Sequence, residues 1–228
     1  RRHLPVRFRR ALLVEPQIKN TAACLTLAAA TVASRDPRRV MVVVPADHWV
    51  GDAVAYRRTV RTAIRAALRE NAIAMIGIRP TYAHTGLGYL RAGAPLRGFN
   101  GSRLFRLAAF IEKPSRAIAA RLSKQPRTYW NNGAFIATAD KFLEVLTVWL
   151  PDHTRHLVPL AAQLRATGGS AARAQAAYRR LKPISFDHGV MDRLQEGVVV
   201  EGRFPWSDVG SVEVWAKLAR HDHADSRA

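Results

Sequence analysis

Two aspartates follow hydrophobic segments at positions where a ligand could reach them. Asp47 stands in PADH (residues 45–48), directly after the valine-rich run Val40–Val44, and Asp208 stands in WSDVG (residues 206–210). In open α/β sheets, ligands bind beyond the carboxyl ends of the strands, and Mg²⁺ prefers one or two carboxylates plus phosphate oxygens. Asp47 and Asp208 are therefore candidate magnesium ligands. Either residue could instead only cap a turn or helix, so the metal site requires a fold that brings the two together.

A glycine pair and an adjacent acid and base offer further binding chemistry. Gly86 and Gly88, in TGLGY (residues 85–89), could let the backbone approach a ligand closely, or could simply form a tight turn. Glu112 and Lys113 end a predicted strand. A carboxylate can accept hydrogen bonds from sugar hydroxyls and an ammonium group can offset phosphate charge. The alternative for this pair is an exposed ion pair that contributes little.

Amide side chains stand at the entry of another predicted strand. Asn131 and Asn132, in WNNG (residues 130–133), supply donors and acceptors, although asparagine is also a common turn residue. Asp187 lies at a predicted helix start, where capping is the simpler interpretation. The sequence shows no zinc-ligand spacing, nucleophile elbow or Ser/His/Asp arrangement.

An α/β framework is predicted to position these residues. The segment 20–33 reads as a helix, residues 40–44 as a strand buried on both faces, and Asp52 as the cap of a long amphipathic helix. A strand at 73–78 follows, an order that implies a right-handed crossover and a mixed, mainly parallel, Rossmann-like sheet. Further strands are predicted at 104–111, 133–138 and 198–201, and further helices at 115–123, 139–150 and 156–181. Together they form one expected domain over residues 1–228 with a polar tail from about residue 220.

The apolar side chains are spread through the 228 residues in an ordinary globular proportion, 48% hydrophobic. No apolar run approaches the length of about 18 residues that indicates a membrane span. The apolar stretch within the basic opening segment is too short for a secretory signal peptide. We therefore expect a cytoplasmic protein without membrane contact. Cys24, the single cysteine, lies in an apolar run and is expected to be buried.

The net charge is strongly positive, with 36 basic against 17 acidic residues and a formal charge of +19. Such a balance favours a polyanionic partner, but the arginines are scattered over nearly every segment, so nucleic acid is not expected as a partner. One cluster is more specific: Arg57, Arg61, Arg65 and Arg69 recur every four residues and would share one face of a helix. This face is either simply solvated or a surface for an acidic partner.

The order of the motifs carries more information than any one of them. The succession closely resembles the catalytic domain of sugar-phosphate nucleotidyltransferases, and in particular the mannose-1-phosphate guanylyltransferases, from about residue 12 to residue 218. The matching segments are EP (15–16), KNTA (19–22), PADH (45–48), GIRPT (77–81), TGLGY (85–89), EKP (112–114), WNNG (130–133), SFDHGVMD (185–192) and WSDVG (206–210).

This resemblance implies the conversion of GTP and mannose 1-phosphate into GDP-mannose and pyrophosphate, with catalysis by positioning and charge stabilisation. It implies that Mg²⁺ is held by the two aspartates already singled out and that Lys113 neutralises the attacking phosphate. The sugar hydroxyls would be bound by Glu112 and by one of the paired asparagines, with the two glycines lining the pocket. Glu15, Asn20 and Thr21 would lie near the guanine.

Departures from the family pattern qualify this expectation. The stretch before Glu15 contains no glycine, so the chain is expected to lack the first strand and the glycine-rich loop that grips the triphosphate, to be incomplete at its N-terminus, and to be impaired as a transferase. A sheet without that strand would expose an apolar edge, so association between copies is expected. Smaller departures are Ala23, Leu87, His188 and Asp192. The alternatives are a nucleotidyltransferase for another sugar 1-phosphate and a non-catalytic basic module that binds nucleic acid or an acidic partner.

Overall fold

The computed structural model describes residues 12–99, 101–167, 170–210 and 214–216. It divides the chain into two compact units, each built from segments distant in sequence. We call residues 42–137 with 194–228 the sheet unit, and residues 1–41 with 138–193 the helical unit. The expected polar tail from about residue 220 lies outside the described residues, and the assignment of the whole chain to one domain stays a prediction.

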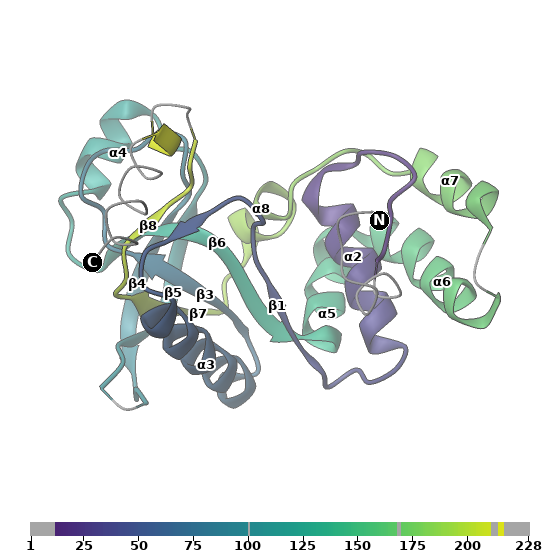
Figure 1. Cartoon of the computed structure of the whole chain (residues 1–228), viewed down its shortest axis with the longest axis horizontal. Coiled ribbons are helices and arrows are strands. Elements are labelled where there is room, and N and C mark those ends of the chain that lie inside the picture. Colours follow the sequence, from purple (N-terminus) through teal and green to yellow (C-terminus); the bar gives the residue numbers. More distant parts are fainter. Residues whose placement is uncertain (1–11, 100, 168–169, 211–213, 217–228) are drawn as a thin grey trace. The chain divides into compact units, whose positions relative to one another are not determined.

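A six-stranded sheet is the framework of the sheet unit (Figure 1). The strand order is β1-β6-β3-β7-β5-β4, and an additional pairing joins β6 to β4. Five strands are therefore linked in a ring of pairings, with β1 at the outer side of β6. The strands are β1 (Val40–Val43), β3 (Ile73–Ile78), β4 (Tyr89–Leu96), β5 (Leu104–Ile111), β6 (Thr128–Thr138) and β7 (Gly197–Gly202).

The sheet is mixed, as the sequence predicts, but its parallel part is smaller than expected. β3 and β7 run parallel, with Ile73 opposite Gly197. The β3–β6, β4–β5, β4–β6 and β5–β7 pairs are antiparallel. For the β4–β5 pair the reason is the short connection between the two strands, because parallel neighbours need a long crossover.

Helix α3 (Ala53–Glu70) covers the two central strands, β3 and β7, and all six residues of β3 are buried (Figure 1). Asp52 begins the helix as predicted, because its Oδ1 accepts hydrogen bonds from the amides of Val54 and Ala55 at 2.9 and 2.8 Å. The sequence predicts an apolar stripe on this helix formed by Ala53, Tyr56, Val60, Ile64, Ala67 and Leu68, and that prediction is wrong in part. The buried face consists of alanines and threonines, and Leu68 of the predicted stripe is 48% exposed.

Strand β1 is less buried than its valine-rich sequence suggests. It lies at the end of the strand order, and Val42 and the following Val44 are exposed. An edge strand has one neighbour instead of two, which explains why a segment predicted to be buried on both faces is only partly covered.

The sheet unit also contains helix α4 (Arg116–Leu122) and the two short strands β2 (Trp49–Val50) and β8 (Trp206–Ser207).

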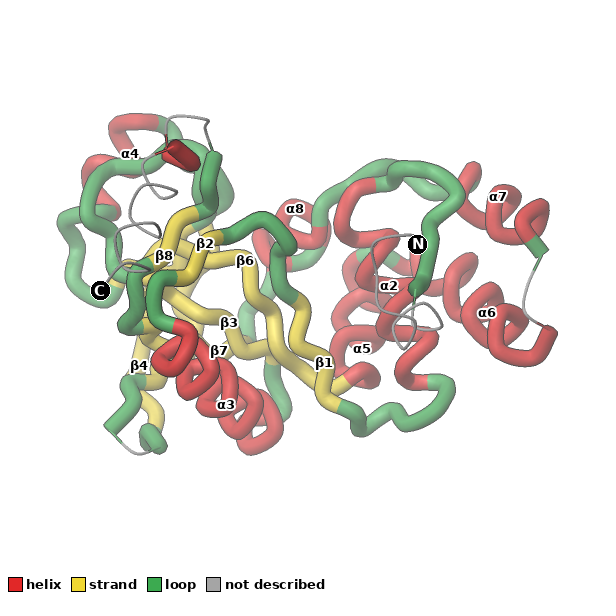
Figure 2. The backbone as a smooth tube through the Cα atoms, viewed as in Figure 1, coloured by secondary structure: helices red, strands yellow, loops and turns green. Residues whose placement is uncertain are grey.

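The described part of the helical unit consists mainly of helices (Figure 2). They are α2 (Asn20–Ala33), α5 (Ala139–Trp149), α6 (Pro151–Thr167), α7 (Ala171–Arg179), α8 (Phe186–Gly189) and the 3₁₀ turn η1 (Met191–Arg193). A core of small and aliphatic side chains around the buried Tyr178 joins α2, α6 and α7. The single long helix predicted over 156–181 is wrong, because α6 begins at Pro151 and a break separates it from α7. Cys24, expected to be buried, lies on the exposed side of α2.

No helix in the described parts of the chain is both long enough and apolar enough to cross a membrane.

The cap of α3 gives a direct test of the local interpretation. Replacing Asp52 with alanine removes the acceptor for two amides at the helix start and should lower the free energy of unfolding by about 1 kcal/mol. Asp52→Asn keeps an acceptor oxygen and should lose only a few tenths of that amount. Urea denaturation of both variants measures the difference, and equal losses would contradict the capping role.

His153 should make the helical unit sensitive to acid. The residue is 4% exposed in α6, and burial lowers the pKa of its imidazole, against the opposing effect of Asp152. Below about pH 6.5, the unfolded chain binds a proton that the folded chain does not yet bind, so stability falls as the pH decreases through the folded pKa. His153→Gln should reduce this fall, measured by urea denaturation between about pH 7.5 and pH 5. An unchanged pH dependence would show that His153 does not contribute.

Candidate active site in the sheet unit

The short strands β2 and β8 bring the two predicted metal ligands into one neighbourhood. They pair antiparallel, with Trp49 opposite Ser207. Continuing this register by one residue sets His48 level with Asp208, and Asp47 is the next residue along. Both carboxylates act electrostatically on the His48 imidazole. Asp47 and Asp208 thus belong to paired segments of backbone and lie within electrostatic reach of one side chain, and their role as joint metal ligands stays a prediction.

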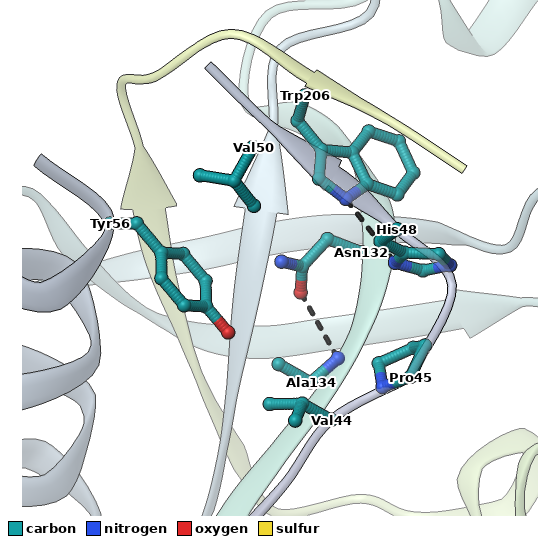
Figure 3. Close-up of a pocket in the computed structure, with 8 residues that line it drawn as sticks. All are labelled: Val44, Pro45, His48, Val50, Tyr56, Asn132, Ala134 and Trp206. Atoms are coloured by element: carbon teal, nitrogen blue, oxygen red, sulfur yellow. Dashed lines mark hydrogen bonds between the residues drawn. The ribbon is translucent and has the colours of Figure 1, made fainter. Parts of the chain in front are cut away.

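His48 is the link between the two segments. Its Nδ1 accepts a hydrogen bond of 3.3 Å from the indole Nε1 of Trp206, and the two rings meet edge to face at 5.1 Å (Figure 3). The ring also donates to the backbone of Asn132. Burial lowers the pKa of His48, while Asp47, Asp208 and the backbone bond oppose that shift. A ring that both accepts from Trp206 and donates to Asn132 is neutral, so it orients the site without adding positive charge.

The WNNG segment lies against the PADH segment. The asparagines were predicted at a strand entry, but they lie inside β6, where Asn131 and Asn132 are 7% and 3% exposed. Gly133 has φ +75°, and a Cβ added there would come within 2.8 Å of the Pro45 Cγ. The close approach of the WNNG and PADH segments therefore requires a glycine at position 133.

The amide oxygens of both asparagines are used locally. Asn131 Oδ1 accepts from the Gly133 backbone amide at 3.2 Å. Asn132 Oδ1 accepts from the Ala134 backbone amide at 3.0 Å, as Figure 3 shows. Each bond determines which end of the side-chain amide is the oxygen. Because the Asn132 oxygen is used by Ala134, the Asn132 side-chain nitrogen is the group left to face the adjoining cavity. That group can only donate hydrogen bonds, which suits hydroxyl or phosphate oxygens on a ligand.

The glycine pair, Glu112 and Asn131 form a second part of the same neighbourhood. The Gly88 carbonyl accepts from the Asn131 amide at 2.8 Å, and a Cβ on Gly88 would lie 2.8 Å from Glu112 Oε2. Gly86 is exposed, and its amide donates to His84 Nδ1 at 3.0 Å. Lys113 Nζ pairs with Glu112 Oε1 at 3.6 Å, and Lys113 has φ +40°, a left-handed conformation that is rare for this residue type. Glycine at 88 thus leaves room for the Glu112 carboxylate.

Aromatic side chains connect this second part to Asp208. Tyr82 and Trp130 meet edge to face at 5.0 Å, and His84 lies 6.1 Å from the Trp130 ring. The Tyr89 hydroxyl holds the His84 loop through bonds to its backbone N–H and C=O. Burial raises the pKa of the Tyr82 phenol, and the negative charge of Asp208 adds to this shift.

A cavity of about 200 Å³ adjoins the β2–β8 pair (Figure 3). Four of its lining residues belong to the PADH, WNNG and WSDVG segments already described: Pro45, His48, Asn132 and Trp206. Pro45, His48 and Trp206 lie in motifs recognised in the sequence, but no role was predicted for them. Val44, Val50, Tyr56 and Ala134, which also line the cavity, were not predicted as site residues. The signal that could have found His48 was its position next to Asp47. The β2–β8 pairing itself could not be predicted, because strands of two residues are too short to show an alternation of apolar and polar residues.

The residues predicted to bind guanine lie in the helical unit. Thr21 Oγ1 accepts from the Phe186 amide at 2.9 Å, and Asn20, with φ 64°, bonds through Oδ1 to the next amide at 2.8 Å. The sequence predicts Asn20 or Thr21 as the N-cap of α2, but Lys19 occupies that position. The Lys19 Nζ donates to the Leu181 carbonyl at 2.7 Å. The start of α2 is thus tied to the chain segment that precedes α8. These contacts give Thr21 a structural task, and a role in binding guanine stays a prediction.

Glu15 also has a neighbour inside the helical unit. Burial raises the pKa of the Tyr178 phenol well above its usual range, and the adjacent Glu15 carboxylate adds to this shift. The Oε1 atom of Glu15 is buried. The carboxylate therefore faces at least partly toward Tyr178, and its expected contact with a nucleotide base stays a prediction.

With this geometry, the likeness to known proteins is informative. The nucleotidyl transferase family matches residues 5–225. The chain belongs to this family. It is 27% identical over 217 residues to the mannose-1-phosphate guanylyltransferase of Escherichia coli, covering 94% of this chain and 46% of that protein. It is 34% identical over 215 residues to the enzyme of the same name from Sinorhizobium fredii, covering 90% of this chain and 40% of that protein.

A solved structure supports the same assignment. The crystal structure of a protein described as mannose-1-phosphate geranyltransferase, from Thermus thermophilus, superposes with a TM-score of 0.74 at 36% identity. The superposition covers 87% of this chain and 55% of that one. The chain thus spans less than half of the two curated relatives above. The mixed α/β fold of the nucleotidyl transferase family is confirmed for the described residues.

The donor set around Asp47 and Asp208 suits magnesium better than a metal held by protein alone. Among the described residues, no three His, Cys, Asp or Glu side chains cluster closely enough to form a complete metal cage. Mg²⁺ commonly uses one or two carboxylates and takes its remaining oxygens from water and phosphates. Asp47 is exposed and Asp208 is half-buried, so both can reach such an ion. The residues present therefore fit a cation shared with a phosphate ligand.

Gly133 should be sensitive to substitution for two separable reasons. Its left-handed backbone costs a residue with a Cβ about 1–2 kcal/mol, and the new atom would also collide with Pro45. Gly101→Ala is the matched control, because Gly101 has φ +76° and nothing within 4 Å of an added Cβ. We expect both alanine variants to lose stability in urea denaturation, and Gly133→Ala to lose more. Equal losses would show that the contact with Pro45 relaxes freely.

Proposed function

We propose that this chain carries the metal- and sugar-phosphate-binding part of a mannose-1-phosphate guanylyltransferase. The reaction is GTP plus mannose 1-phosphate to GDP-mannose plus pyrophosphate. The observation that carries the proposal is the β2–β8 pairing, which sets Asp47 and Asp208 on adjacent stretches of backbone beside His48, in a chain 34% identical to a protein of that name. A chain of contacts supports a common site for the other family motifs of the sheet unit.

The chemistry asked of the protein is modest. An oxygen of the mannose 1-phosphate phosphate forms a bond to the α-phosphorus of GTP, while the bond from that phosphorus to the bridging oxygen breaks and pyrophosphate leaves. Little covalent work falls to side chains, so orientation and charge stabilisation dominate. In our proposal, Asp47 and Asp208 hold Mg²⁺, which would offset the negative charge of the phosphates.

The sugar is proposed to lie near Glu112 and the paired asparagines. Glu112 can accept hydrogen bonds from hydroxyl groups, and the Asn132 amide nitrogen can donate to a sugar or phosphate oxygen. Lys113, whose side chain is exposed beside Glu112, would approach the phosphate of mannose 1-phosphate. Gly88 keeps the Glu112 carboxylate close to the backbone, and Gly86 is proposed to border the same pocket. Glu15, Asn20 and Thr21 are proposed for the guanine side.

The proposal predicts a metal-dependent loss of binding in two conservative variants. Asp47→Asn and Asp208→Asn keep the side-chain shape but remove the charge, so each should weaken Mg²⁺-dependent binding of mannose 1-phosphate by about tenfold or more. Titration calorimetry of the full chain with and without Mg²⁺ measures this effect. Asp36→Asn is the control: this aspartate of the helical unit has a side chain that is 46% exposed, and the variant should bind as the wild type does. Wild-type affinity in Asp208→Asn would overturn the assignment.

Substrate identity needs a separate measurement. GDP-mannose should bind more tightly than UDP-glucose in the presence of Mg²⁺. Tighter binding of UDP-glucose would favour the alternative, a family member that acts on another sugar 1-phosphate. Release of pyrophosphate from GTP and mannose 1-phosphate then tests whether the chain also completes the reaction.

A further inference from the structure

The sheet unit contains a second and larger cavity, of about 440 Å³, at the flank of α3. It shares no lining residue with the cavity beside His48. Its walls come from one face of α3, from the turn between β4 and β5, and from the end of β7. The lining residues are Arg58, Thr59, Arg61, Thr62, Arg65, Phe99, Gly101, Ser102, Arg103, Val200, Glu201 and Arg203. Five arginines and a single glutamate leave an excess of four formal positive charges.

The one acid of this cavity is already neutralised. Glu201 is 8% exposed at its side chain, lies 2.8 Å from Arg203 Nε and 3.7 Å from Arg103 Nη1, and accepts a bond of 3.2 Å from the Tyr129 hydroxyl. The Glu201 charge helps raise the pKa of Tyr129 to about 12, although burial is the larger cause. The carboxylate is thus held at the base of the cavity by these partners and does not offset the arginines of α3.

The α3 arginines have no such partner. Within the described residues, no carboxylate forms an ion pair with Arg58, Arg61 or Arg65. Arg69, which the sequence places on the same face, pairs instead with Glu70 at 2.7 Å and lies over the Phe99 ring at 4.6 Å. Like charges three and four residues apart oppose a helix. Three such charges gathered at one concave wall therefore carry a cost that a bound anion would offset.

A hydroxyl group also lines the cavity, between the arginines of α3. It belongs to Thr62, and no hydrogen bond joins it to another described residue. By contrast, the neighbouring Thr59 hydroxyl donates to the Ala55 carbonyl at 2.9 Å. The Thr62 hydroxyl is thus a neutral group that can donate a hydrogen bond to a ligand oxygen.

We propose that this cavity binds a small molecule that carries at least two phosphate groups. Guanidinium groups match phosphate oxygens in pairs, better than ammonium groups do. Arg58 to Arg65 covers roughly 10 Å of helix rise, which suits more than one anionic group. The cavity volume lies within the range of small-molecule sites, about 300–1,000 Å³, and its concave wall differs from the long open track that a nucleic acid needs.

The test uses inorganic pyrophosphate as the probe, titrated into the full chain in EDTA, so that metal-dependent binding near Asp208 does not contribute. The wild type should bind pyrophosphate at least about tenfold more tightly than orthophosphate. The double variant Arg61→Ala/Arg65→Ala should lose at least about tenfold in pyrophosphate affinity. Arg57→Ala is the matched control: it removes an arginine from the same helix but outside the cavity, and should bind as the wild type does.

Further variants separate the site from general charge and from the proposed active site. Thr62→Val should weaken pyrophosphate binding without changing any charge, and Asp208→Asn should leave it unchanged. Arg61→Lys/Arg65→Lys retains the charges and should bind with intermediate affinity, which guards against loss of folding in the alanine variant. Equal weakening by Arg57→Ala, equal affinity for orthophosphate, or tight binding of a single-stranded oligonucleotide without binding of pyrophosphate would each overturn the proposal.

Discussion

The candidate active site depends on one small pairing, that of β2 with β8. Two residues from each strand are involved, yet they join segments separated by most of the sheet unit. The hydrogen bond from Trp206 to His48 reinforces the pairing, and His48 then donates to the backbone of Asn132 in β6. Because the central histidine is held from two sides, Asp47 and Asp208 are fixed on neighbouring stretches of backbone. Rigid support of this kind is what a site for two phosphates and a cation requires.

Much of the fold could be predicted from the sequence because the relevant patterns are local. Helix α2 and strands β3 and β5 have the predicted bounds, since a run of apolar residues between helix and strand breakers is readable without knowledge of its neighbours. The features that could not be predicted depend on residues that are distant in the sequence. β6 begins at Thr128, several residues before the predicted start, because it pairs with β4 there and accommodates the two asparagines through bonds to their own backbone.

The site was predictable in part for the same reason. Asp47 could be singled out because it follows a strand, but its relation to Asp208 depends on strands too short to produce alternation. The partly wrong apolar stripe of α3 has a different cause. Large apolar residues suggested one face, whereas the helix buries Ala55, Ala63 and Ala66 with Thr59 and Thr62. Threonine can be buried at little cost in a helix when its hydroxyl bonds to the carbonyl four residues earlier, as that of Thr59 does.

This buried face also explains how a scattered excess of arginine becomes a specific site. Small side chains let α3 approach β3 and β7 closely, so the arginines at its flank border the strand ends and the turn after β4 instead of pointing only into solvent. Arg69 pairs with Glu70 and lies over Phe99, and Arg103 and Arg203 share the single carboxylate of Glu201. The arginines of the cavity that have no carboxylate partner among the described residues are Arg58, Arg61 and Arg65. Composition alone could not distinguish these three residues from the others, because the distinction arises from which carboxylates the fold places within reach.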